Sequence, residues 1–142
     1  MAEARMRERP TGATATIGRT GFPAIRSRTG GTLAIVTGAN QAGFNPLDLL
    51  YASLSACLAM SARYAASRMG VLDRLTTIEV TVSGEKAEAG PARVETFDIA
   101  FIIGGDIDEG TRQAIVRVAE DEICTVSNTI RGNPQFRTTI SG

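Results

Sequence analysis

The 142-residue sequence contains no histidine and only two cysteines. Without histidine, the chain lacks the side chain that most often acts as a general base near neutral pH. Histidine is also a common metal ligand, and two cysteines alone cannot complete a tetrahedral zinc site within one chain. We therefore expect no metal site, and any chemistry is expected at the two thiols.

The sequence also has no excess of charge of either sign, with 15 basic and 15 acidic side chains. Nucleic acid and anionic membrane surfaces both attract basic patches, so this balance argues against either as a partner. A chain with so little net charge lacks self-repulsion, which makes self-association easy.

No apolar run is long enough to cross a bilayer. The longest charge-free apolar run, residues 49–62, has 14 residues, whereas a spanning helix needs about 20. The segment 1–12 is charged and has no apolar centre, so it does not resemble a secretory signal. We therefore expect a cytoplasmic protein, and in that compartment a thiol pair is more often catalytic or redox-sensing than structural.

What the sequence does contain is the pattern of a single α+β domain over residues 1–142, with a polar, flexible segment at 1–10. Short segments of strand composition, separated by glycine-rich turns, predict consecutive antiparallel strands. Two longer alternating segments predict a β-hairpin, and one more strand is expected near the C-terminus. The expected strands are 13–19, 23–28, 32–37, 75–85, 92–105 and 135–140.

Two helices complete this pattern. The first spans 45–70, with an asparagine–proline pair at its start and a glycine at its end. It is apolar almost all round, which is typical of a central, buried helix. The second is expected to begin at Asp106, paired with Glu109 as a cap, and to run to about Ile123, followed by a turn at 127–134. The order is β-β-β-α-β-β-α-β.

The two cysteines occupy the middle of the first helix and the end of the second. Cys57 lies in a nearly uncharged stretch, and Cys124 opens the segment CTVSN. At helical spacing, Cys57 shares a face with Leu50, Ser53, Leu54, Met60, Ser61 and Tyr64. A cysteine in an apolar helix is usually an inert small hydrophobic residue, so the position of Cys57 alone does not decide its role.

Four stretches of the chain, in order, resemble the OsmC/Ohr family of osmotically inducible protein C-like thiol peroxidases. Residues 13–21 resemble the family's N-terminal strand, which ends in a functional arginine. NPLDLLYASLSAC at 45–57 resembles its NPEELxAAAxAAC helix, with the same step from asparagine to cysteine. Residues 106–124 resemble the helix before the second cysteine, and CTVSN at 124–128 resembles the CPxSN run.

This resemblance implies that Cys57 is the peroxidatic thiolate and Cys124 the resolving thiol. It implies that Arg19 lowers the pKa of Cys57 and orients the peroxide. It further implies an intertwined homodimer in which antiparallel sheets enclose the central helices and the active sites lie at the subunit interface. The implied substrates are organic or fatty hydroperoxides, and hydrogen peroxide to a varying degree. No metal or prosthetic group takes part, and a dithiol reductant reopens the disulfide.

The family's chemistry makes further residues candidates. The sequence has Leu47 where the family often has a glutamate that pairs with the arginine. Asp48, one position later, is a candidate partner for Arg19 and equally a residue that favours the helix start. An apolar lining suits a hydrophobic peroxide, and the candidate lining residues are Phe44, Leu50, Tyr51, Leu54 and Met60.

Two other functions remain open. The absence of acid at Leu47 fits a non-catalytic relative that binds a hydrophobic ligand in its dimer cleft. A thiol redox sensor is also compatible with the cysteines, although the sequence identifies no partner for it. Taken without the resemblance, Arg19 is interpreted as a solvated strand arginine, and Cys124 as a free buried thiol or part of a structural disulfide.

Overall fold

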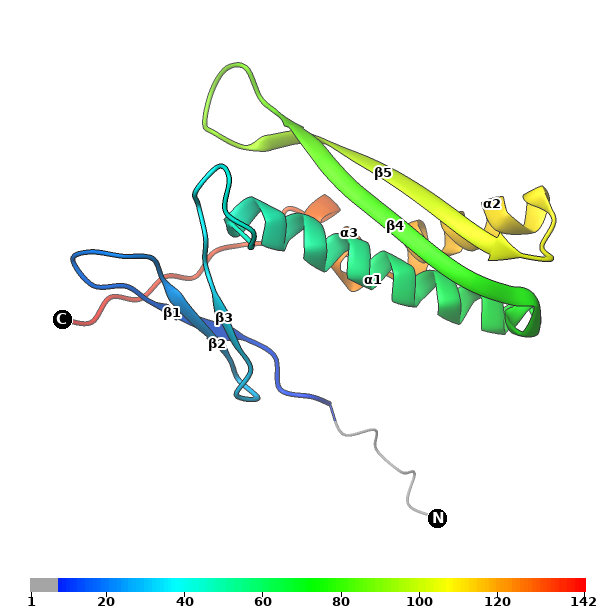
Figure 1. Ribbon diagram of the computed structural model, residues 1–142, viewed down its shortest axis with the longest axis horizontal. Helices are drawn as coiled ribbons and strands as arrows, with labels where there is room; N and C mark the ends of the chain where they lie inside the picture. The colour runs from blue at the N-terminus through cyan, green and yellow to red at the C-terminus, as the bar shows by residue number, and fades with distance from the viewer. Residues whose placement is uncertain (1–7) are drawn as a thin grey trace, which may run out of the picture. The chain divides into compact units, whose positions relative to one another are not determined.

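The computed structural model describes residues 8–142, which divide into two compact units (Figure 1). The first unit ends at Leu49 and the second begins at Leu50, within the helix α1 (Pro46–Arg68). The expected flexibility of 1–10 falls outside the described residues for 1–7, and residues 8–10 form no helix or strand. The expectation of a single domain stays a prediction.

The first unit contains an antiparallel sheet in the order β1-β2-β3, formed by β1 (Ala13–Thr16), β2 (Ala24–Ser27) and β3 (Thr32–Ala34). All three strands are predicted by the sequence, but each is shorter than expected. As a result Arg19 lies in a bend beyond the end of β1. Ile35 is the one buried residue of 8–49, so the sheet has almost no core of its own.

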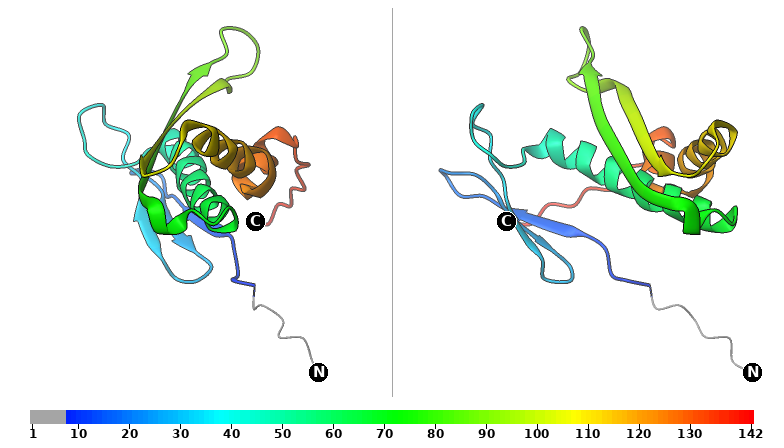
Figure 2. Two further views of the ribbon diagram at one scale, coloured as in Figure 1. Left: turned by 90° about the vertical axis from the view of Figure 1, so that its right-hand side faces the viewer. Right: turned by 45° about the vertical axis from the view of Figure 1, so that its right-hand side comes forward.

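The second unit is built on α1, over which the hairpin of β4 (Leu75–Lys86) and β5 (Val94–Gly105) is laid (Figure 2). The helix begins after Asn45, as predicted, and Gly70 ends it with a φ of 74°. That backbone conformation is open to glycine at little cost, and it lets the Val71 N–H reach the carbonyl of Ala66 at 3.0 Å. The helix and hairpin predictions are confirmed.

One face of α1 forms the core of the second unit. Small residues in its second half pack against Ile103 of β5 and Ile115 of α2 (Glu109–Val118), while Leu54 and Leu58 pack against Cys124. The opposite face exposes Met60 and Tyr64. Enclosure of this helix on all sides, expected of the homodimer, therefore stays a prediction. No helix among residues 8–142 has the length and apolar character needed to cross a bilayer.

The second helix is capped two residues later than expected, at Asp108 instead of Asp106, and it spans Glu109–Val118. β5 continues to Gly105, and the Asp106 N–H donates to the carbonyl of Arg74, which keeps this segment attached to the hairpin. Asp108 is the actual N-cap, because its carboxylate accepts a 2.7 Å hydrogen bond from the Thr111 N–H. That hydrogen bond lowers the pKa of Asp108.

The C-terminal predictions are also wrong. After α2 the backbone widens into the π-helical turn η2 (Ala119–Ile123), and the expected turn at 127–134 is largely the helix α3 (Thr125–Arg131). The expected strand at 135–140 does not form, and Phe136 and Ile140 are almost fully exposed. A strand needs a neighbour to accept its backbone hydrogen bonds, and no strand of residues 8–142 pairs with this segment.

Candidate thiol site

The second unit brings both cysteines into one apolar cluster. Cys57 comes from the middle of α1, and Cys124 lies between η2 and α3. Cys124 is fully buried among Leu54 and Leu58, while Cys57 is partly exposed at the edge of the same cluster. Both are free thiols, and both belong to the same packed cluster.

The surroundings of Cys57 favour its thiolate. Burial is the strongest influence and opposes ionisation, but four hydrogen-bond donors together outweigh it. They are the backbone N–H of Val126, the thiol of Cys124, the hydroxyl of Ser61 and the backbone N–H of Thr125, and with them the pKa of Cys57 lies below its ordinary value. The partly exposed sulfur is therefore the more nucleophilic of the pair.

Cys124 has the opposite character. Burial raises its pKa most strongly, the Ser127 N–H, 3.4 Å from its sulfur, opposes this shift, and the neighbouring Cys57 raises the pKa further. Of the two thiols, Cys57 is therefore the one that ionises more readily. This division matches what a two-thiol reaction needs, an accessible thiolate that attacks and a protected thiol that follows.

A hollow of about 560 Å³ opens beside Cys57 on the surface of the second unit. Its lining is mainly apolar, with Tyr64, Leu72 and Ile123 among the lining residues, and it also includes Arg63. Of the five residues expected to line a substrate site, only Met60 lies here. The others lie elsewhere: Leu54 is buried in the core, Tyr51 packs edge-to-face on Phe97, Leu50 is half-buried in α1, and Phe44 belongs to the first unit.

From the sequence alone, Ser61 and the residues that follow Cys124 have no expected role. Ser61 is 5% exposed and lies one helical turn from Cys57. The shared helix face already contained the signal for Ser61 and Tyr64, since both fall at helical spacing from Cys57. No sequence signal placed Thr125 and Val126, because their approach to Cys57 depends on how the chain folds back after α2.

Arg19 and Asp48 both lie in the first unit, where each has a separate environment. Asp48 takes part in a capping box, with its carboxylate accepting from the Asn45 N–H at 3.0 Å and its own N–H donating to the Asn45 side chain at 2.8 Å. Within residues 8–142 no ion pair joins Arg19 to Asp48. The roles proposed for these two residues in the reaction stay predictions.

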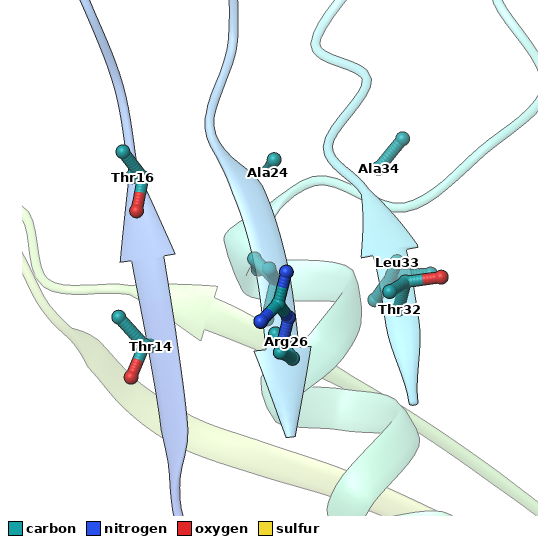
Figure 3. Close-up of a pocket in the computed structure, with 8 residues that line it drawn as sticks. Thr14, Thr16, Ala24, Arg26, Thr32, Leu33 and Ala34 are labelled. Atoms are coloured by element: carbon teal, nitrogen blue, oxygen red, sulfur yellow. The ribbon is translucent and has the colours of Figure 1, made fainter. Parts of the chain in front are cut away.

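Other parts of the described chain offer no comparable chemistry. No group of three or more metal-ligating side chains gathers among residues 8–142. A second hollow, of about 620 Å³, lies on the sheet of the first unit, where Figure 3 shows Thr14, Thr16 and Arg26 along its strands. Its lining contains a basic side chain but no thiol and no carboxylate. It therefore has neither a nucleophile pair nor an acid–base pair.

Replacing Ser61 with alanine is expected to raise the pKa of Cys57, because the thiolate loses one of its donors. Since only the thiolate reacts, the pH profile of Cys57 alkylation should move to higher pH, with a rate at pH 7 lower by about five-fold. The rate of iodoacetamide labelling at the Cys57 peptide measures this. Ser67→Ala, in the same hollow, is the control. Superimposed profiles for Ser61→Ala and the unmodified protein would contradict the assignment.

Comparison with known proteins places these features in a family. A family model described as OsmC-like protein matches residues 38–139. Among solved structures, the organic hydroperoxide resistance protein OhrB of Bacillus subtilis is 28% identical, with a TM-score of 0.64 over 87% of this chain and 92% of that one. An organic hydroperoxide resistance protein OsmC from Legionella pneumophila is 24% identical, with a TM-score of 0.66 over 90% and 93%.

An OsmC-like protein from Mycoplasma pneumoniae is 17% identical and has the same fold, with a TM-score of 0.73 over 89% of this chain and 90% of that one. No curated protein sequence matches the chain. The α+β fold with antiparallel sheets, expected from the resemblance, is confirmed by these structures.

Proposed function

Because the chain belongs to the OsmC-like protein family, we propose that it is a thiol-dependent peroxidase that reduces organic hydroperoxides in defence against oxidative stress. The observation that carries this proposal is the unequal thiol pair. Cys57 has a lowered pKa and borders an open hollow, while Cys124 is buried and has a raised pKa. The similarity in structure to organic hydroperoxide resistance proteins also supports a role with organic hydroperoxides.

In the proposed reaction, the Cys57 thiolate attacks the outer oxygen of a hydroperoxide. The O–O bond breaks, the alcohol leaves with a proton, and Cys57 becomes a sulfenic acid. The Cys124 sulfur then attacks the Cys57 sulfur, so that a disulfide forms and water leaves. A dithiol reductant returns both cysteines to thiols and is itself oxidised to a disulfide. Every step uses sulfur, oxygen and protons only, so no cofactor is needed.

The hollow beside Cys57 supports an organic rather than a purely polar substrate. Met60, Tyr64 and Leu72 are exposed there, and they offer an apolar surface to the alkyl part of a hydroperoxide. We assign to Arg19 the role of orienting the peroxide, following the family resemblance. The Asp48 carboxylate is its candidate partner, in addition to capping α1.

We further propose that the protein is a cytoplasmic homodimer. Residues 8–49 of the first unit have one buried residue, Ile35, and expose Phe22 and Phe44, while α1 exposes Met60 and Tyr64, so both units present apolar surface that a second copy can cover. Sedimentation equilibrium is expected to give twice the 15.0 kDa chain mass at micromolar concentration. A monomer at all concentrations would contradict this assembly. The cytoplasm suits a pair of cysteines that must be reduced after each cycle.

Peroxide consumption under turnover tests the proposed activity. The protein is mixed with excess dithiothreitol and either cumene hydroperoxide or hydrogen peroxide, and the remaining peroxide is measured over time. The proposal predicts catalytic consumption, faster for cumene hydroperoxide because of the apolar hollow. Consumption at the rate of dithiothreitol alone would overturn the peroxidase function.

The alternative function is non-catalytic binding of a hydrophobic ligand by the same fold. Leu47, at the position where the family often has an acid, favours this alternative. It predicts no reaction of Cys57 with either peroxide, together with saturable binding of a fluorescent fatty-acid probe. Binding without peroxide reaction would replace the peroxidase proposal with this one.

A further inference from the structure

Cys124 directly follows the π-helical turn η2, which is stabilised by side chains from another element. Its N–H donates to the carbonyl of Ala119, five residues earlier, at 2.9 Å, so η2 is one residue wider per turn than an α-helix. Such turns are rare and tend to occur at functional sites. A regular helix through this segment would shift Cys124 by about 100° around the axis and so turn it away from Cys57.

The support comes from three side chains of α3 that reach back to η2. The Ser127 hydroxyl donates to the carbonyl of Glu120 at 3.1 Å, and the Asn128 amide donates to the carbonyl of Glu122 at 3.3 Å. These bonds satisfy carbonyl groups that the wide turn leaves without helical partners. They tie the first turn of α3 to η2 on both sides of Cys124.

Arg131, at the end of α3, adds a charged contact to the same turn. Its guanidinium donates to the Glu120 carboxylate at 2.7 Å and to the Asp121 carboxylate at 3.0 Å. One planar group therefore joins two acidic side chains that would otherwise repel each other, a geometry that lysine cannot reproduce. We call Ser127, Asn128 and Arg131, with their contacts to η2, the α3 clamp.

We propose that the α3 clamp positions the Cys124 thiol for disulfide formation with Cys57, and that Arg131 is a positioning residue of this step. The clamp connects η2 to α3, and Cys124 lies at their junction. It also holds Thr125 and Val126, whose N–H groups act on Cys57. The proposal deepens the proposed function, since it concerns the resolving step of the same reaction.

The glutathione equilibrium of the thiol pair tests the clamp without any peroxide. In this exchange Cys57 and Cys124 lose two protons and two electrons to form their disulfide, and one oxidised glutathione becomes two reduced glutathiones. The equilibrium constant gives the effective concentration of one thiol toward the other. Arg131→Ala is expected to lower this effective concentration about five-fold. The reduction potential of the two-electron couple then rises by about 20 mV.

Three further variants and a change of salt concentration separate positioning from loss of fold. The reduction potential of Arg131→Lys is expected to lie between those of the unmodified protein and Arg131→Ala. Because the ion pairs of Arg131 are exposed, 1 M salt should shift the potential of the unmodified protein toward that of Arg131→Ala. Arg93→Ala, which removes a comparably exposed ion pair with Glu95 in the hairpin, is the matched control and should leave the potential unchanged. The double variant Glu120→Gln, Asp121→Asn removes the same contact from the other side.

An unchanged or more negative potential in both Arg131→Ala and the double variant would overturn the proposal, and so would an equal shift in Arg93→Ala. The outcome does not depend on peroxidase activity. If the protein does not consume peroxide but the potential shifts as expected, the clamp proposal stands and the peroxidase proposal fails. If the protein consumes peroxide but the potential does not shift, the peroxidase proposal stands and the clamp proposal fails.

Discussion

Cys57→Ser is expected to lower peroxide consumption to the background rate of the reductant. A serine hydroxyl at this position is not ionised near neutral pH, and the donors that lower the pKa of Cys57 do not bring a hydroxyl into a reactive range. Cys124 cannot replace the lost thiolate, because it is fully buried and its pKa is raised. Peroxide consumption with dithiothreitol measures the loss.

Cys124→Ser is the matched variant, and it should separate the two steps. The first oxidation of Cys57 is expected to be retained, because the serine hydroxyl can donate in place of the Cys124 thiol and the other donors to Cys57 are unchanged. Without a resolving thiol the protein should stop at a sulfenic acid, seen by intact mass as the gain of one oxygen and by reaction with dimedone. If Cys124→Ser consumes peroxide as fast as the unmodified protein does, the resolving role of Cys124 is contradicted.

Arg19→Gln is expected to slow the reaction with cumene hydroperoxide about a hundred-fold, which is the usual cost of removing one donor from a developing charge. The alkylation profile of Cys57 should change much less. Val126, Thr125, Ser61 and Cys124 already lower the pKa of Cys57, all from within the second unit. Arg19 is therefore proposed to act mainly on the peroxide, and less on the thiol than the sequence analysis expected.

Stopped-flow mixing with peroxide and iodoacetamide labelling across pH measure the two effects separately. Arg26→Gln, in β2 of the same sheet, is the matched control and should leave both unchanged. If Arg19→Gln reacts with peroxide within two-fold of the unmodified protein, Arg19 has no part in the reaction. If Arg19→Gln slows the peroxide reaction and the alkylation of Cys57 by the same factor, Arg19 acts only on the pKa of Cys57.

The sequence predicts the elements whose signals are local. The asparagine–proline start and glycine end of α1 are such signals, because each satisfies the backbone at a helix terminus without help from the rest of the chain. The alternating pattern of β4 and β5 is another, since a hairpin pairs neighbouring segments. Both are found in the structure with bounds close to those expected.

The errors occur where the outcome depends on contacts distant in the sequence. Ser127 and Asn128 have the composition of a turn, but their side chains bond to carbonyls of η2 and support a helix instead. Asp106 has the composition of a helix cap, but the hairpin retains it through its N–H. Residues 135–140 have strand composition and no strand among residues 8–142 with which to pair.

In the candidate site, too, the features with a local sequence signal are predicted, and those that depend on distant contacts are not. The two cysteines are identifiable from sequence because they are scarce and lie at motif positions. Of the residues expected to line a substrate site, Met60 lies in the hollow beside Cys57, whereas Leu54 is buried in the core and Tyr51 packs on Phe97 of the hairpin, so the substrate-site assignment stays a prediction. Which side of α1 the hairpin covers is decided by packing against β4 and β5, and an all-round apolar helix carries no periodic signal for it.

The most direct test of the account is the intact mass of the reduced protein after mixing with one equivalent of cumene hydroperoxide. The account predicts a rapid loss of two hydrogens, with a single linked peptide pair that contains Cys57 and Cys124. An unchanged mass after minutes in excess peroxide, with both cysteines still open to alkylation in denaturant, would contradict it.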